Sequence, residues 1–182
     1  MKKLIFITLL LIISCDVKDG ELIEYHENGE VDYRVNIING QFDGQFKQYY
    51  KSGQLSLILN YSNGKKHGIA KHYYEDGQIS MESNYKNDKH HGTTKHWYEN
   101  GILKVEGYYE NGLEHGLHKG WYESGQKLAI ENFIKGKLDG VKKVWFENSV
   151  LQKEIFLLNG KIDGNYKEFY ENGNKRYMWY FK

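Results

Sequence analysis

Apolar and polar residues alternate singly along much of the chain. The segment 54–61, QLSLILNY, carries Leu or Tyr at every second position from Leu55 to Tyr61, and the segment 78–85, QISMESNY, shows a similar alternation with Ile79, Met81 and Tyr85. A period of two is typical of a β-strand with one covered face. Beyond the first fifteen residues no segment shows a sustained helical period. The sequence therefore predicts an all-β fold.

The pattern recurs every 24 residues without insertion or deletion. Each unit contains an aromatic pair and two glycines. The first aromatic column is Tyr25, Tyr49, Tyr73, Trp97, Trp121, Trp145 and Phe169, and the second is His26, Tyr50, Tyr74, Tyr98, Tyr122, Phe146 and Tyr170. One glycine column runs from Gly29 to Gly173 with Ser149 as its exception, and the other runs from Gly44 to Gly164. Self-similarity of this kind predicts an array of about seven repeats over residues 24–182.

Each unit is predicted to be a β-hairpin, because Asn-Gly and Asp-Gly pairs favour two-residue type I′ turns. A two-residue loop at residues 52 and 53 would pair residue 51 with 54, residue 50 with 55 and residue 47 with 58. The same register sets Lys71 opposite Glu82, Lys95 opposite Glu106 and Lys143 opposite Glu154, and cross-strand ion pairs support it. It places the second aromatic on one face with Leu55, Leu57 and Tyr61, and the first aromatic on the other face with the lysines.

The expected architecture is an elongated, curled antiparallel β-meander of tandem 24-residue hairpins. Two strands per repeat give roughly fourteen strands, and a twisted sheet of that width should curl into a trough.

The first fifteen residues form a different pattern. Met1-Lys2-Lys3 precedes an apolar run from Leu4 to Ile13, which ends at Ser14-Cys15 before a polar stretch. About ten apolar residues are too few to span a bilayer, which needs about 20. A basic start and a short apolar run predict a signal peptide over 1–14. Ile12-Ile13-Ser14-Cys15 resembles the bacterial lipobox, which implies lipidation of Cys15, a short tether over 15–23 and attachment to the bacterial cell envelope. A plain signal peptide with an incidental cysteine is the alternative.

Composition narrows the functional classes. The chain holds 25 Lys and Arg against 24 Asp and Glu, a balance that argues against nucleic-acid binding by bulk charge. One cysteine excludes a disulfide framework and a Cys-rich zinc site. We therefore expect no nucleic-acid partner and no cofactor.

Recurring His and Glu residues raise metal and catalytic hypotheses. His67, His91 and His115 precede glycines, and His, like Asp, tolerates the left-handed backbone expected at such a turn. Equivalent residues of neighbouring repeats lie about 10 Å apart, too far to converge on one metal. A Glu such as Glu99 that recurs beside a turn is interpreted as a solvated residue, since a catalytic carboxylate is usually singular and held in a cleft. We expect no metal site and no enzyme activity.

The best binding candidates are two residue columns. The aromatic set is Tyr49, Tyr73, Trp97, Trp121, Trp145 and Phe169, and the lysine set is Lys47, Lys71, Lys95, Lys119, Lys143 and Lys167. Exposed aromatics anchor protein interfaces or stack on sugars, whereas the same rings in the hollow of a curled sheet would be core. The lysines could read phosphate or lipid headgroups, or simply pair with the glutamates across the strands.

The run Trp97-Tyr98-Glu99-Asn100-Gly101 and the run from Tyr61 to Gly68, YSNGKKHG, resemble the variant MORN repeat. The array is most similar to bacterial repeat proteins of the YwqK-type antitoxin family. This resemblance implies a hairpin scaffold for protein association, and an antitoxin would bind a toxin protein.

We therefore expect a non-catalytic scaffold for protein–protein interaction at the envelope. A glycan- or membrane-surface-binding lipoprotein is the alternative. The apolar strand Tyr177–Phe181 should form a sheet edge open to dimerisation or partner docking, unless Lys175, Arg176 and Lys182 blunt it.

Overall fold

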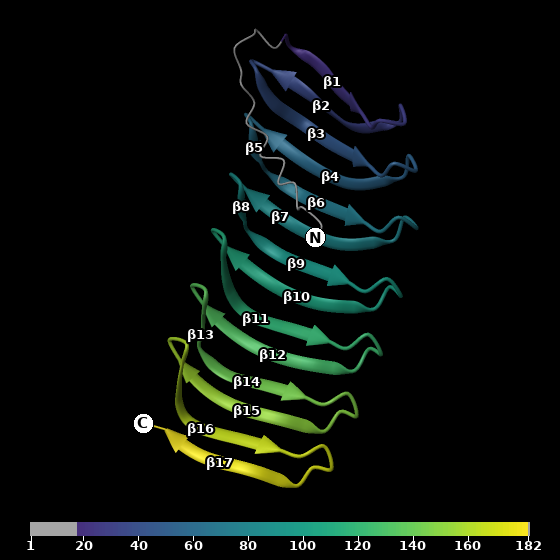
Figure 1. Ribbon diagram of the computed structural model, residues 1–182. Coiled ribbons are helices and arrows are strands. Elements are labelled where there is room, and N and C mark those ends of the chain that lie inside the picture. Colours follow the sequence, from purple (N-terminus) through teal and green to yellow (C-terminus); the bar gives the residue numbers. More distant parts are fainter. Residues whose placement is uncertain (1–17, 182) are drawn as a thin grey trace, which may run out of the picture.

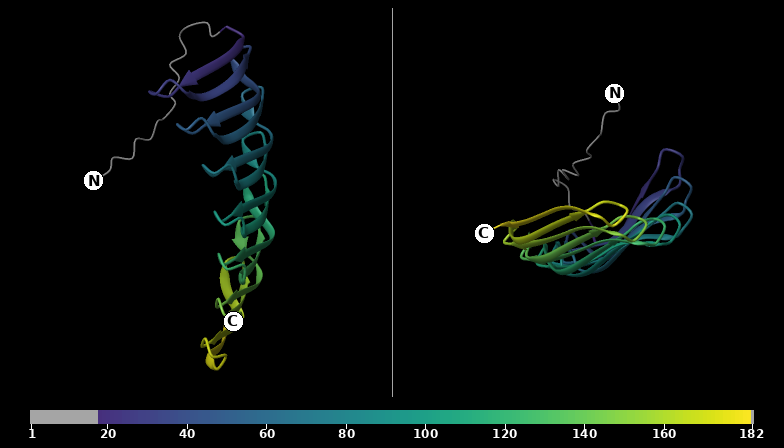
Figure 2. Two further views of the ribbon diagram at one scale, coloured as in Figure 1. Left: turned by 90° about the vertical axis from the view of Figure 1, so that its right-hand side faces the viewer. Right: turned by 90° about the horizontal axis from the view of Figure 1, so that it is seen from below.

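The computed structural model describes residues 18–181 as one open antiparallel sheet, which confirms the predicted all-β meander, and divides it into seventeen strands (Figure 1). Each strand pairs with the neighbouring strands of the chain, so the sheet is a meander. Two further views show that the stack of hairpins twists along its length and that the sheet is curved (Figure 2). Within these residues no helix is long and apolar enough to cross a membrane. The predicted signal peptide and Cys15 lie outside the described residues.

The strands follow the repeat. They are β1 (Gly20–Tyr25), β2 (Val31–Ile38), β3 (Gln41–Tyr49), β4 (Leu55–Ser62), β5 (Lys65–Lys66), β6 (Gly68–Tyr73), β7 (Ile79–Lys86), β8 (Lys89–His90), β9 (Gly92–Trp97), β10 (Leu103–Glu110), β11 (Leu113–Trp121), β12 (Lys127–Ile134), β13 (Lys137–Leu138), β14 (Gly140–Trp145), β15 (Leu151–Leu158), β16 (Lys161–Phe169) and β17 (Lys175–Phe181). Three of the seventeen, β5, β8 and β13, are two-residue segments continued by the next strand. Counting each split strand once leaves the fourteen strands expected from the repeat.

The turn after each aromatic pair has three residues and not the predicted two. In the second repeat the Tyr50 amide donates to the Gln54 carbonyl at 2.7 Å, and the Gly53 amide donates to the Tyr50 carbonyl at 2.9 Å. Of the residues in this turn only Gly53 has a positive φ, 82°. A three-residue loop with a left-handed glycine is one of the common β-hairpin turns. The predicted pairing of residue 50 with 55 and of 51 with 54 is therefore wrong.

A β-bulge next to this turn restores the predicted register. Tyr49 pairs with Leu55, but Gln48 pairs with Leu57, so that one extra residue is absorbed within two steps of the turn. Lys47 then pairs with Ile58 as predicted. The predicted pairs of Lys71 with Glu82, Lys95 with Glu106 and Lys143 with Glu154 are likewise confirmed. Leu55 shares a face with the first aromatic and not with the second, contrary to the prediction.

The type I′ geometry occurs at the other turn. Asn63 and Gly64 both have positive φ, 49° and 74°, and Ser62 pairs with Lys65 across them. The adjoining His67 does not adopt the left-handed conformation expected of it. The following glycine does so instead, with φ of 83° at Gly68, and interrupts the strand between β5 and β6.

The sheet has two unlike faces, which we name by their residues. The lysine face carries the lysine column. The core face carries a central row that includes Val35, Leu59, Ala70, Ser83, Thr94 and His118, all buried although no second layer covers them within residues 18–181. Neighbouring side chains of the same face supply part of this burial, as where the rings of Tyr109 and Phe133 lie 5.5 and 4.7 Å from the His118 ring.

Ser149 supplies the first stability prediction. It occupies the left-handed position of its turn with φ of 67°, where the other repeats have glycine. A non-glycine residue there costs about 1–2 kcal/mol, so Ser149→Gly should raise the free energy of unfolding by about 1 kcal/mol in urea denaturation. The reciprocal change Gly101→Ser should lower it by a similar amount. Equal stability of Ser149→Gly and wild type would contradict this account.

Candidate interaction face

One row of charged side chains crosses the lysine face from strand to strand. Across the strands it reads Arg34, Lys47, Ile58, Lys71, Glu82, Lys95, Glu106, Lys119, Ile130, Lys143, Glu154, Lys167 and Met178. The strand pairing thus aligns all six lysines of the sequence-predicted site on one face. No repeat-to-repeat offset disperses them, because every unit has the same length.

Glutamates within the row bind lysines on both sides. Glu106 lies 3.4 Å from Lys95 and 3.8 Å from Lys119, and Glu154 lies 3.0 Å from Lys143 and 2.7 Å from Lys167. Hydrogen bonds from Lys167 and Lys143 lower the pKa of Glu154. Lys71 pairs with Glu82 at 3.4 Å. Five of the six lysines therefore lie within 4 Å of a carboxylate, but Lys95 and Lys119 share Glu106, and Lys143 and Lys167 share Glu154, so their charge is only partly offset.

Lys47 differs from the other lysines. Its cross-strand neighbours are Arg34 and Ile58, and within residues 18–181 no carboxylate lies within 4 Å of its ammonium. The positive charge of the row is thus unpaired at its N-terminal end, on β2 and β3, and is partly offset by glutamates elsewhere.

The first aromatic column forms a second row on the same face, beside the aromatic turns. Its cross-strand partners are Leu55 for Tyr49, Ile79 for Tyr73, Leu103 for Trp97, Lys127 for Trp121, Leu151 for Trp145 and Lys175 for Phe169. The rings are half-buried, neither a fully exposed track nor a closed core. The Lys127 ammonium lies 5.1 Å from the Trp145 ring centroid. Much of each ring is therefore used in contacts within the sheet.

A third row on the lysine face is more exposed and was missed by the sequence analysis. It lies on the far side of the lysines from the aromatic row, in the C-terminal half of the array. Its exposed apolar residues, which we call the apolar stripe, are Tyr108 (41% exposed), Leu117 (48%), Val141 (43%), Phe156 (40%) and Tyr180 (68%). Val141 and Phe156 are direct cross-strand partners.

The stripe replaces residues that have a structural task in other repeats. The column of Tyr108, Phe156 and Tyr180 holds Asn60, Asn84 and Asn132 elsewhere. Those amides donate across a strand irregularity to the carbonyl oxygens of Ile69 at 2.6 Å, Thr93 at 3.1 Å and Asp139 at 2.8 Å. An aromatic ring cannot make this bond. The change of residue type within an otherwise regular column was the signal that could have revealed the stripe.

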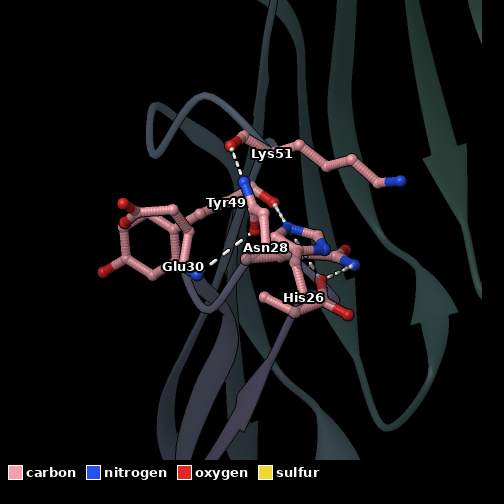
Figure 3. A network of polar contacts seen from close by, with 7 residues as sticks. His26, Asn28, Glu30, Tyr49 and Lys51 are labelled. Carbon is pink, nitrogen blue, oxygen red and sulfur yellow. Dashed lines mark hydrogen bonds and ion pairs between the residues drawn. The ribbon is translucent and has the colours of Figure 1, made fainter.

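The second aromatic column ties each repeat to the next. The hydroxyls of Tyr50, Tyr74, Tyr98 and Tyr122 donate to the carbonyl oxygens of Tyr73, Trp97, Trp121 and Trp145 at 2.6, 2.6, 2.9 and 2.8 Å. In the first repeat His26 takes this role, with its Nε2 3.0 Å from the Tyr49 carbonyl, and Asn28 adds a parallel bond to the Lys51 carbonyl at 2.9 Å (Figure 3). Burial, followed by nearby carboxylates, raises the pKa of Tyr74 and Tyr122, which keeps these hydroxyls protonated donors.

Comparison with known families agrees with this geometry. The model of the MORN repeat variant matches residues 18–39, 42–63, 66–87, 91–111, 114–135 and 162–182, well over half of the chain. The chain belongs to the MORN repeat variant family. MORN repeats generally mediate interactions with proteins or membranes and serve as non-catalytic scaffolds. No curated protein matches the chain.

The matched stretches leave out residues 136–161, yet these residues form the same hairpin as the other MORN repeats. The Phe146 amide donates to the Val150 carbonyl at 2.9 Å, and the Ser149 amide donates to the Phe146 carbonyl at 2.9 Å. Phe146 and Ser149 are the two departures from the repeat consensus at this turn. The tolerance for both shows that strand pairing, more than any one side chain, defines a MORN unit here.

Among the described residues of the MORN array, no group of three or more His, Cys, Asp or Glu side chains lies close enough together to hold a metal ion. His72 and His96 instead line a hollow on the core face together with Tyr74, Met81 and Val105. Burial lowers the pKa of both imidazoles, and the positive charge of nearby Lys and His side chains lowers it further. Burial also lowers the pKa of His90, with a contribution from Lys66.

These shifts predict that acid destabilises the array before any carboxylate titrates. The unfolded histidines have a pKa of 6.5, above their folded values, so the unfolded state binds more protons as pH falls. The free energy of unfolding should therefore start to fall near pH 6.5 and stop falling once the pH is below the folded pKa values. Urea denaturation at successive pH values measures this slope.

The matched variant for this slope is His72→Gln with His96→Gln, because Gln48 occupies the equivalent position in an earlier repeat. The double variant should show a clearly smaller loss of stability between neutral and mildly acidic pH. An unchanged slope would mean that other groups cause the pH dependence.

Proposed function

We propose that this MORN array is a non-catalytic scaffold that binds a protein partner through the C-terminal half of its lysine face. The observation that carries the proposal is the apolar stripe. Exposed apolar residues that gather on one face and are bordered by charges mark interaction sites on proteins. In the stripe they are interrupted only by Asn132, the partner of Leu117, and Asn165, the partner of Tyr180. The stripe runs along the lysine and glutamate row, so a partner can bury the apolar residues and meet alternating charges at their edge.

Charge favours a protein over an anionic membrane surface or a phosphate-rich ligand. Lipid-headgroup attraction depends on unpaired Lys and Arg near the surface. Along the stripe Lys119, Lys143 and Lys167 each lie within 4 Å of a glutamate, which reduces their attraction for such a surface although the glutamates are shared between lysines. The half-buried tryptophans give correspondingly little flat surface for stacking on sugars. A partner with an apolar strip and its own alternating charges fits this face better.

We further propose that the array works at the bacterial cell envelope, held by a lipid on Cys15. The support is the lipobox-like segment Ile12-Ile13-Ser14-Cys15 at the end of the apolar run. The resemblance to YwqK-type antitoxins makes a toxin protein met in the envelope the specific partner to test.

The decisive experiment is affinity capture from solubilised envelope with wild type and a stripe variant. Leu117→Gln and Val141→Gln copy Gln45, which stands in the same column, and Tyr108→Asn and Phe156→Asn copy Asn60. Because the chain already uses these residues at equivalent positions, the variant should fold. We expect a stoichiometric partner with wild type, which is reduced at least tenfold with the stripe variant.

Two controls sharpen the result. Ile69→Gln changes an exposed residue of the same face outside the stripe and should leave capture intact. Replacing Trp97, Trp121 and Trp145 by Ala tests the alternative that the aromatic row binds a glycan. Equal capture of the partner by wild type and the stripe variant would overturn the proposal.

A further inference from the structure

We infer that the chain self-associates head to tail, with β17 of one copy adding to β1 of the next so that the repeat continues across the junction. The two strands are the edges of the sheet. Among the described strands β1 pairs only with β2, and β17 only with β16, and they lie at opposite ends of the array (Figures 1 and 2). This inference is independent of the partner proposed above.

The repeat itself supplies the register of the junction. β17 occupies the place of β15 one repeat later, and β1 occupies the place of β16 six repeats earlier. Within the array Glu154 pairs with Lys167, and Ile155 pairs with Tyr166. The equivalent junction pairs are Met178 with Ile23 and Trp179 with Leu22.

The junction pair of Met178 with Ile23 is apolar where the equivalent internal pair, Glu154 with Lys167, is charged. Met178 and Trp179 are 53% and 61% exposed, and an uncovered apolar edge strand is a template for another strand. Ile23 at the other edge offers an apolar neighbour to Met178 in the row that elsewhere alternates lysine and glutamate. The junction therefore replaces a surface ion pair by an apolar contact.

Charge complements the two edges. β1, GELIEY, contains Glu21 and Glu24 and no Lys or Arg, whereas β17, KRYMWYF, contains Lys175 and Arg176 and no acidic residue. An antiparallel pair of two β1 strands would bring Glu21 of one copy close to Glu24 of the other. The opposite net charges of the two edges favour the pairing of β17 with β1, and a head-to-tail contact that does not close gives an open assembly.

Two side chains of the last repeat, Tyr170 and Asn172, have no partner within residues 18–181 for the hydrogen bond that their equivalents make to the next repeat. Tyr170 belongs to the second aromatic column, is 51% exposed and would need a carbonyl one repeat further on. By the spacing of 23 residues between the hydroxyl and carbonyl of each internal tie, this carbonyl is that of Tyr25 in the next copy. Asn172 would likewise reach the carbonyl of Glu27, as Asn148 reaches that of Glu171.

Sedimentation velocity of the full chain over a hundredfold concentration range tests the inference. We expect a growing series of species and no fixed end point. Ile23→Lys and Met178→Glu should each weaken association about tenfold, because each sets a buried charge against an apolar residue. Tyr170→Phe should weaken it several-fold, the value of one hydrogen bond.

Mixing the two charged variants distinguishes the geometry. Met178→Glu and Ile23→Lys recreate the Glu154–Lys167 pair at the junction, so an equimolar mixture should assemble far better than either variant alone. A tail-to-tail dimer would respond to Met178→Glu only and would not be rescued by mixing. That result, or a wild type that stays monomeric, would overturn the inference. The stripe variant serves as the control and should assemble like wild type.

Discussion

Replacing Tyr50, Tyr74, Tyr98 and Tyr122 together by Phe should lower the free energy of unfolding by about 4 kcal/mol. Each hydroxyl donates to a backbone carbonyl in the next repeat at 2.6–2.9 Å. A hydrogen bond of this kind contributes about 1 kcal/mol net, and the four ties lie in separate repeats, so their losses should add. For a domain of ordinary stability this is a large share of the total.

The same change should reduce cooperativity between repeats. The stability of a repeat array is a sum of unit terms and nearest-neighbour terms, and the tyrosine ties belong to the neighbour terms. Urea denaturation should therefore show a lower midpoint together with a broader transition. The ring is retained in Phe, which leaves the packing of each unit largely unchanged.

The chain contains its own control for this prediction. Phe146 occupies the tyrosine column but has no hydroxyl, so Phe146→Tyr should add a tie to the Phe169 carbonyl and raise stability by about 1 kcal/mol. A quadruple variant that loses less than about 1 kcal/mol would show that water replaces the hydroxyls and that backbone pairing alone couples the repeats.

The sequence was sufficient for the architecture because the repeat specifies it many times over. Alternation, the 24-residue period and the Lys and Glu columns agree on one register at mid-strand, and the pairs of Lys71 with Glu82 and Lys95 with Glu106 confirm it. The turns were predicted wrongly because two errors compensate. A three-residue turn shifts the register by one residue, and the bulge beside Leu55 shifts it back. The pairing in the middle of the strands is therefore the same with or without these two features, and the charge pairs there do not reveal them.

The candidate interaction face was less predictable for a different reason. A regular column such as the lysines draws notice, but most of these lysines are occupied by glutamates. The apolar stripe arises where an aromatic residue replaces the asparagine that other repeats have in the same column, as at Tyr108 and Phe156. The tyrosine ties were not predicted either, because a perfect repeat does not say whether a side chain bonds within its own unit or to the next.

Gly107→Ala should destabilise the array by about 1–3 kcal/mol, the usual cost of overpacking. Gly107 lies in the buried central row of the core face, where Thr94 is its partner on one side and His118 lies on the other. A Cβ at this position would lie 2.5 Å from the Cε1 and Nδ1 atoms of the His118 ring. The backbone at Gly107 has no positive φ, so the expected cost is steric and not conformational.

The His118 ring has little freedom to move aside. Its side chain is buried, its Nε2 lies 3.0 Å from the Tyr108 carbonyl, and its ring centroid is 4.7 Å from that of Phe133 and 5.5 Å from that of Tyr109. Relief of the clash would break that hydrogen bond or separate the rings. The large His118 ring occupies space that the missing side chain of Gly107 leaves free. One repeat earlier the equivalent positions hold Ser83 and Thr94, two side chains of similar size.

A double-mutant cycle isolates the clash. His118→Ala alone should be destabilising because it leaves a cavity, but combined with Gly107→Ala it should remove most of the added cost, a coupling of about 2 kcal/mol. Gly120→Ala is the matched control, since the nearest atom to its Cβ is 3.8 Å away and its φ is not positive. It should leave stability unchanged or slightly raised. Additive effects of Gly107→Ala and His118→Ala in urea denaturation would show that the two positions do not share space.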